Sequence, residues 1–185
     1  INYDLKNYHY YNGYACLNDR MDMDLAPAQI QTFYNPAADA VMYRLMQSVD
    51  PRLFAFIIGG IQGIGFFLLF RIALLFLARC APGFRESAAL VTAVLGMAGS
   101  LSVSLAGSTF HDQTLGVGFL AGILLLLGSR TDAHNGPAGR RFIAAALAGW
   151  LIGAVTGLKL TISIYAAGAW IASTLVMPSG KKGLK

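Results

Sequence analysis

Hydrophobic and polar positions divide the chain into a polar, aromatic first quarter and a long apolar remainder. Residues 1–52 mix tyrosines with charged side chains, and six of the nine acidic residues lie at or before Asp50. No charged residue occurs from Leu53 to Phe70, and this stretch would be about 27 Å long as a helix. That length matches the apolar core of a bilayer. The pattern therefore predicts a polar segment followed by membrane-spanning helices.

Apolar stretches after residue 52 are separated by short polar or glycine-containing turns. We predict five spans, at residues 53–79, 87–106, 115–129, 142–158 and 160–177. The third is short unless its helix starts near Asp112. Gly149, Gly153 and Gly157 follow one another at four-residue spacing in the fourth, which permits close helix packing. The predicted fold is an all-α polytopic bundle of about five spans (53–178) followed by a basic cytoplasmic tail (179–185).

Helix signals also occur within residues 1–52. Tyr10, Tyr14 and Leu17 have helical spacing, which predicts a short helix from about residue 5 to 17. Asn35-Pro36 predicts another over roughly 36–47, and Asp50-Pro51 opens the first span. Because tyrosine rings favour the headgroup zone, we interpret this segment as an external loop containing short interfacial helices.

Composition argues against a single soluble core and favours a multi-span membrane protein. The chain is 56% hydrophobic and 12% charged, with a mean hydropathy of +0.56, whereas soluble domains carry about 25% charged residues. The net charge of +5 does not indicate nucleic-acid binding, because the basic residues form no stripe with interleaved aromatic side chains. They fall near predicted helix ends instead.

Basic residues also predict the topology. If the five spans alternate, most basic residues after Arg71 lie on one side, which the positive-inside rule makes cytoplasmic. These residues are Arg79, Arg85, Arg130, Arg140, Arg141, Lys181, Lys182 and Lys185. Residues 1–52, the His111-Asp112 loop and Lys159 then share the external side. Cys16 and Cys80 are predicted to face opposite sides and to remain unbridged.

Three ionisable residues at that external side are candidates for chemistry. Asp4 could be a general base toward a hydroxyl group, or a solvated or helix-capping carboxylate. Asp112 could cap the third span, or face Asp4 and help it to share a proton or bind a divalent cation. Lys159 could mark a helix end by reaching the interface, or bind a phosphate as a point charge.

The spacing of the histidines does not predict a metal site. His9 and His111 lack the short spacing of zinc ligands, so we predict no zinc site. The chain opens on polar residues without a leading apolar span, which leads us to expect a helix before it and further helices after it.

Several strings in the chain resemble the GT-C superfamily of integral-membrane glycosyltransferases, in particular its bacterial members. They are YDLKNYHYYNGYACLN, YNPAADAVMY, GSTFHDQTLG and GLKLT, at residues 3–18, 34–43, 107–116 and 157–161. The resemblance covers most of the chain through loose motifs. It implies a bacterial plasma-membrane enzyme that moves a sugar from a polyprenyl-phosphate donor to a glycan or lipid acceptor.

The resemblance also implies roles for individual residues. Asp4 matches the acidic residue of the first external loop, which acts as catalytic base or positions the acceptor, and Asp112 matches the acidic residue of the second. Lys159 falls where a basic residue contacts the lipid phosphate. His9, Tyr10 and His111 are expected near the substrate. Family members usually have more than five spans, so part of the donor cavity is expected outside this chain.

Two other classes of function remain open from the residues alone. A lipid or small-solute transporter requires ionisable residues near the middle of the membrane. A non-catalytic scaffold subunit would tolerate loss of both Asp4 and Asp112. The relative positions of Asp4, Asp112 and Lys159 separate these alternatives best.

Overall fold

The computed structural model describes residues 3–131 and 137–175, and within these ranges the chain is all-helical without strands. The N-terminal segment, residues 3–50, contains four short helical elements, and the remaining helices are longer except for one. The first group comprises a π-helical turn Leu5–His9, α1 Tyr10–Leu17, a 3-10 helix Gln29–Phe33 and α2 Ala37–Ser48. The second comprises α3 Pro51–Phe76, α4 Pro82–Met97, α5 Ser100–Ser104, α6 His111–Thr131, α7 Ala138–Leu158 and α8 Ile162–Leu175.

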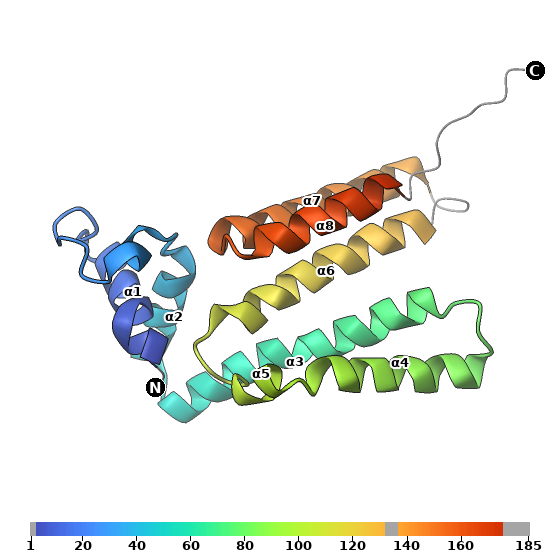
Figure 1. Ribbon diagram of the computed structural model, residues 1–185, viewed down its shortest axis with the longest axis horizontal. Coiled ribbons are helices and arrows are strands. Elements are labelled where there is room, and N and C mark those ends of the chain that lie inside the picture. The colour runs from blue at the N-terminus through green and yellow to red at the C-terminus, as the bar shows by residue number, and fades with distance from the viewer. Residues whose placement is uncertain (1–2, 132–136, 176–185) are drawn as a thin grey trace, which may run out of the picture.

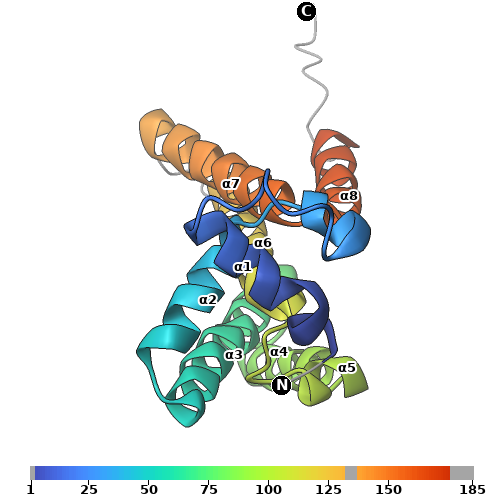
Figure 2. The same cartoon turned by 90° about the vertical axis from the view of Figure 1, so that its left-hand side faces the viewer.

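The long helices lie side by side, and the N-terminal segment covers one end of them (Figure 1). α6 lies in the middle and packs on both α3 and α7, while α4 packs on α3 and α8 on α7. Figure 2 views the molecule from the covered end and shows α1 and α2 in front of the bundle. The beginning of α6 and the turn between α7 and α8 therefore meet the N-terminal segment.

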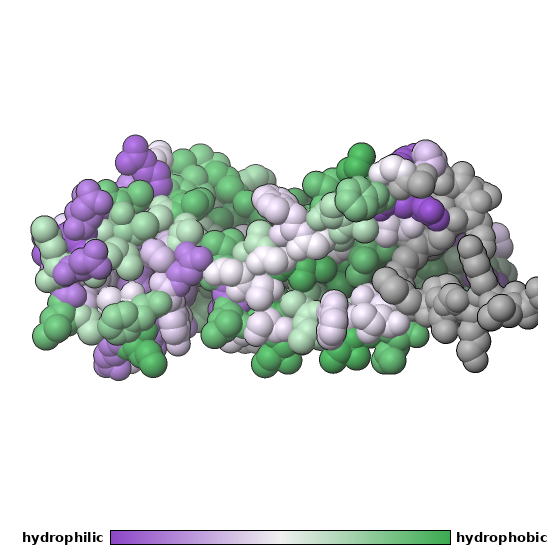
Figure 3. Space-filling view, turned by 90° about the horizontal axis from the view of Figure 1, so that it is seen from above, coloured by the Kyte–Doolittle hydropathy of each residue, from purple (hydrophilic) through white to green (hydrophobic). Residues whose placement is uncertain are grey.

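Three helices are long and apolar enough to cross a membrane: α3, α6 and α7. α6 and α7 have 21 residues each, so each is about 32 Å long against a hydrocarbon core of about 30 Å. Large side chains such as Phe56, Phe67 and Trp150 are exposed on them. Figure 3 shows hydrophilic residues gathered over the N-terminal segment and mainly apolar residues along the helices. We therefore treat the chain as a membrane protein.

The two other predicted spans are shorter in the structure. α4 begins at Pro82 and ends at Met97 after 16 residues, and α5 follows as a separate short helix. Gly96 and Gly99 favour the break at residues 98–99, because glycine costs a helix about 1 kcal/mol relative to alanine. The predicted span 160–177 corresponds to α8, which has 14 residues within the described part of the chain. The predicted tail 179–185 lies outside that part.

Close packing of α6 on α7 uses glycines of α6 and not the three evenly spaced glycines of α7. A Cβ atom added at Gly118 would lie 2.7 Å from Val155 Cγ1, and one at Gly122 would lie 2.7 Å from Ile152 Cγ1. Gly149, Gly153 and Gly157 would meet nothing within 4 Å. Within the described part of the chain, the prediction that another helix packs closely on the α7 glycines is therefore wrong. Four-residue spacing permits close approach without determining which face is used.

Other local predictions are confirmed. Residues 5–17 are helical, and α2 follows Asn35-Pro36, where Asn35 Oδ1 accepts a hydrogen bond from the Ala37 amide. Asp50 caps α3 by accepting a hydrogen bond from the Arg52 amide, with Pro51 in the first turn. Cys16 and Cys80 are both free.

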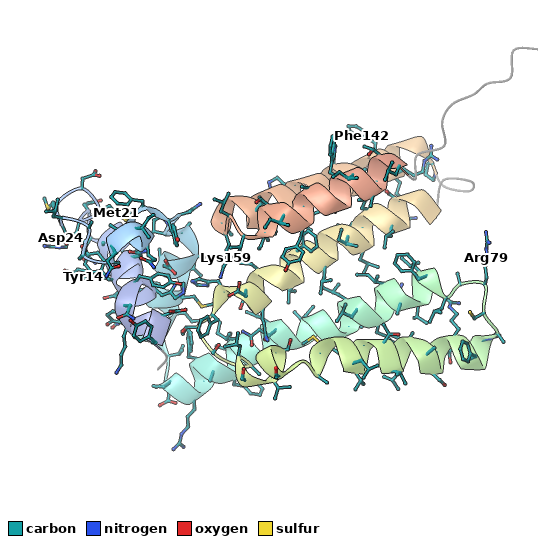
Figure 4. All side chains as sticks on the ribbon, viewed as in Figure 1. Tyr14, Met21, Asp24, Arg79, Phe142 and Lys159 are labelled. Atoms are coloured by element: carbon teal, nitrogen blue, oxygen red, sulfur yellow. The ribbon has the colours of Figure 1, made fainter. Side chains whose placement is uncertain are left out.

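Three of the basic residues predicted to share one side, Arg79, Arg140 and Arg141, lie at the same end of the bundle, whereas Lys181, Lys182 and Lys185 are outside the described residues. Arg79 lies in the connection from α3 to α4 at the end far from the N-terminal segment, whereas Lys159 lies beside that segment (Figure 4). Arg140 and Arg141 occupy the first turn of α7, which begins at the same end as Arg79 (Figure 1). His111, Asp112 and Lys159 thus share an end of the bundle with residues 3–50.

Candidate functional site

Asp39 lies between two histidines in a buried cluster formed by three separate elements. Its Oδ1 atom is 2.6 Å from Nδ1 of His9 and 2.6 Å from Nε2 of His111. The three residues expose only 5%, 7% and 6% of their surfaces, respectively. They come from α2, the π-helical turn and the first residue of α6. One carboxylate thus joins parts of the chain separated by 30 and 72 positions.

The local backbone places His9 and Asp39 against each other. In the π-helical turn the Tyr10 amide donates to the Leu5 carbonyl, five residues back, and such widened turns often occur at functional sites. At Gly13 an added Cβ atom would lie 2.6 Å from both the Asp39 carbonyl oxygen and Tyr43 Cβ. Only a glycine therefore lets α1 approach α2 this closely.

A buried glutamine positions the loop that precedes His111. Gln62, on α3, is 3% exposed, and its Oε1 atom accepts a 2.8 Å hydrogen bond from the Gly107 amide. Its Nε2 atom donates to Thr114 Oγ1 on α6 at 3.4 Å. Gly107 has a φ of +69°, a conformation that glycine adopts without strain. Gln62 thus connects the loop and the first turns of α6 to a spanning helix.

The charge of Asp39 is stabilised by its neighbours. Burial by itself raises the pKa of this carboxyl, but the hydrogen bonds and charges of His111 and His9 together lower it below its ordinary value. Tyr8 lies nearby, and burial together with Asp4, Asp39 and Asp112 raises the pKa of its hydroxyl to about 12. Tyr8 therefore remains protonated beside three carboxylates.

The cluster forms one wall of a cavity of about 580 Å³ between the N-terminal segment and the turn that joins α7 to α8. Lys159 also lines this cavity, as do the apolar residues Leu158, Leu160 and Ile164. Leu160 and Ile164 are 80% and 75% exposed. The cavity therefore connects a buried polar cluster with an apolar outer surface at the end of the bundle.

Asn35 holds the N-terminal segment against the bundle at this cavity. Its Nδ2 atom donates a 2.8 Å hydrogen bond to the carbonyl of Gly157, near the end of α7. Both residues line the cavity, so this bond fixes two of its sides relative to each other. The loop signature at residues 34–36 gave no indication of this long-range contact.

Lys159 and Asp112, which the sequence predicts on the same side of the membrane, form an ion pair that was not predicted. Lys159 Nζ lies 2.8 Å from Asp112 Oδ1, and Asp112 is the second residue of α6. Asp112 is therefore within the first turn of its helix, not before it, and its carboxylate faces an ammonium group. The pair stands beside the His9–Asp39–His111 cluster, since His111 and Asp112 are adjacent in the chain.

Asp4 and Tyr10 lie elsewhere. Asp4 precedes the π-helical turn and lines a separate pocket of about 170 Å³, which shares Tyr8 with the larger cavity. Tyr10 is 43% exposed, and its hydroxyl accepts a 2.9 Å hydrogen bond from Gln47. Tyr10 is not among the residues that line the cavity. Its contact with substrate, like the catalytic roles of Asp4 and Asp112, stays a prediction.

The residues that could hold a metal ion differ from those expected. We anticipated a cation between Asp4 and Asp112, whereas among the described residues it is His9, Asp39 and His111 whose ligand atoms lie within 4.8 Å of one another. Spacing along the chain was a poor guide, because folding brings His9 and His111 to 4.6 Å between ring centroids. Asp39 was missed because an acidic residue in a first helical turn resembles an ordinary helix-end charge.

No family model, curated protein or solved structure matches this chain. The site is therefore interpreted from its own geometry together with the sequence motifs.

Proposed function

We propose that this chain is a GT-C-type membrane glycosyltransferase, which moves a sugar from a polyprenyl-phosphate donor to an acceptor hydroxyl group. The observation that carries the proposal is the cavity beside α8. One of its walls is a buried cluster of two histidines and an aspartate, and another is made of exposed apolar side chains such as Leu160 and Ile164. A donor with an isoprenoid tail and a phosphate head has the matching distribution of apolar and polar parts.

In this proposal the donor phosphate lies near Lys159. Its ammonium lines the cavity and is held by Asp112 at 2.8 Å. As the bond from the anomeric carbon to the phosphate oxygen breaks, its electron pair remains on the polyprenyl phosphate. A fixed positive charge stabilises that developing anion.

The acceptor occupies the smaller pocket that contains Asp4. Several polar side chains line this pocket, among them Asn7, Gln29 and Gln31, as a hydroxylated acceptor requires. The acceptor oxygen attacks the anomeric carbon with inversion, and the Asp4 carboxylate takes its proton. Tyr8 lines both pockets and therefore stands at the boundary between donor and acceptor. The N-terminal segment faces the outside of a bacterial plasma membrane in this scheme.

A transporter is less well supported by the same geometry. It needs ionisable groups near the middle of the membrane, and between Leu53 and Phe76 of α3 the only such side chain is Arg71, which is exposed. The described part of α8 contains no Asp, Glu, Lys, Arg or His. The cavity also lies at an end of the bundle and not between the spans.

A liposome assay tests the proposed function. The chain would be reconstituted with a panel of radiolabelled polyprenyl-phosphate hexoses, and release of the sugar to an acceptor or to water would be measured. We expect release by the wild type and a loss of roughly 100-fold in Asp4→Asn, since a positioned general base contributes about 10²–10⁴-fold. Asp19→Asn is the matched control, because Asp19 has a φ of +53° that asparagine tolerates.

Three outcomes would count against the proposal in different ways. No release by correctly inserted wild type with any donor would overturn the glycosyltransferase proposal. Equal release by wild type and Asp4→Asn would remove Asp4 from the mechanism. Release of intact donor across the bilayer, without cleavage, would favour the transporter.

A further inference from the structure

We propose that His9, Asp39 and His111 bind a zinc ion on the wall of the cavity. The ligand atoms are Nδ1 of His9, Oδ1 of Asp39 and Nε2 of His111. This inference concerns metal binding alone, so it stands or falls independently of sugar transfer.

The three atoms already converge on a small region. Both ring nitrogens are 2.6 Å from the same carboxylate oxygen, and the ligand atoms of the three residues lie within 4.8 Å of one another. Zinc binds histidine nitrogen and carboxylate oxygen at about 2.0–2.2 Å, so tetrahedral ligands stand about 3.4 Å apart. Side-chain shifts of under about 1 Å would therefore open the cluster to these lengths.

The types of ligand select the class of metal. Two imidazoles and one carboxylate favour zinc and similar transition metals, whereas magnesium and calcium prefer ligand sets made of oxygen alone. Asp39 is the only formal charge among the three ligands when the histidines are neutral. A divalent ion would thus leave one net positive charge, which suits binding of an anionic oxygen.

The position of the cluster indicates an open coordination site. All three residues line the cavity, so an ion held by them would face it with its fourth position. Three protein ligands with a free position are typical of zinc ions that bind substrate or water, whereas structural zinc ions are enclosed by four ligands. Any role of this ion toward a donor phosphate would rest on the proposed function.

A network of hydrogen bonds alone does not satisfy the cluster. His9 is 93% buried, and its Nε2 atom has no hydrogen-bond partner. An unpaired buried polar atom is costly, and an ion on Nδ1 would not pair this Nε2 atom. Metal–ligand bonds contribute directly to folding free energy, so zinc binding through Nδ1 would still offset the cost of burying the cluster.

The surroundings of the ligands hold them in place. Gly13 lets α1 pack against the backbone of Asp39, and Gln62 anchors the loop before His111 through the Gly107 amide. Ligands fixed by neighbouring contacts in this way bind metal more tightly than mobile ones. The cluster therefore has the supporting contacts that a metal site requires.

Metal content of the purified chain tests the site. The protein in detergent would be stripped with a chelator, dialysed against Zn²⁺ and analysed by inductively coupled plasma mass spectrometry. We expect about one zinc ion per chain in the wild type, and at least a roughly tenfold loss of affinity in His9→Gln, His111→Gln and Asp39→Asn. Asp24→Asn, a change in the same N-terminal segment but outside the cluster, should bind zinc like the wild type. Mg²⁺ should not compete.

A variant that gains a spectroscopic signal controls for the possibility that the loss variants misfold. His111→Cys replaces one zinc ligand by another, so with Co²⁺ it should show a near-ultraviolet thiolate-to-cobalt absorption band that the wild type lacks. Wild type that binds no zinc, loss variants that bind it fully, or a folded His111→Cys protein without this band would each overturn the proposal.

Discussion

Lys159 Nζ lies 2.8 Å from Asp112 Oδ1, although the two residues are 47 positions apart in the chain. The first belongs to the turn between α7 and α8, and the second to the first turn of α6. The pair closes the end of the helical bundle where it meets the N-terminal segment. Because Lys159 also lines the cavity, Asp112 keeps a positive charge at its edge.

Replacing Lys159 by glutamine should weaken the binding of polyprenyl phosphate. The change removes a charge-assisted contact of about 1.5–3 kcal/mol, so we expect an affinity loss of about tenfold or more, measured by thermal shift in detergent. Lys6→Gln is the control, since Lys6 is an exposed lysine of the N-terminal segment. Equal affinities of both variants would show that Lys159 does not contact the phosphate.

Replacing Gly13 by alanine should destabilise the N-terminal segment. The new Cβ atom would lie 2.6 Å from the Asp39 carbonyl oxygen, so α1 and α2 must separate. Overpacking of this kind costs about 1–3 kcal/mol, which a lowered unfolding temperature in detergent would report. Gly60→Ala meets nothing within 4 Å and serves as the control. A Gly13→Ala protein as stable as wild type would contradict the close approach of the two helices.

Substitutions of the α6 glycines should lower the stability of the bundle more than substitutions of the α7 glycines. Gly122→Val places a branched side chain against Ile152 and the Ala148 carbonyl on α7, so it should separate α6 from α7 and destabilise the bundle by about 1–3 kcal/mol. Gly153→Val points into open space and should change stability little. Unfolding by a denaturing detergent, followed by circular dichroism, compares the two variants. The reverse ranking would indicate that α7 packs through its own glycines.

The loop after α1 should loosen in acid. Asp24 accepts hydrogen bonds from Arg20 and Tyr11, and these partners lower the pKa of its carboxyl below the ordinary value. A depressed folded-state pKa stabilises the loop above the unfolded pKa of about 3.9, and this stabilisation is lost as the pH falls through the folded pKa. Cleavage of residues 18–28 by pepsin should therefore accelerate more steeply with falling pH in wild type than in Asp24→Asn. Parallel pH profiles would exclude the Asp24 contacts as the cause.

The sequence by itself determined the local and one-dimensional features of this protein. Long uncharged stretches predicted the helices, and Asn35-Pro36 and Asp50-Pro51 marked two helix starts correctly, because caps and hydrophobic length act within a few residues. The distribution of lysine and arginine also placed His111, Asp112 and Lys159 at the same end of the bundle as residues 3–50. These inferences need only the order of residues along the chain.

Only the tertiary structure decided which side chains meet. Asp39 joins His9 and His111 across 30 and 72 positions, and no spacing rule reaches that far. The choice between the glycines of α6 and α7 was also open, since both sets permit a close approach. Contacts of this kind depend on which helix faces pack together, and that is a property of the whole fold.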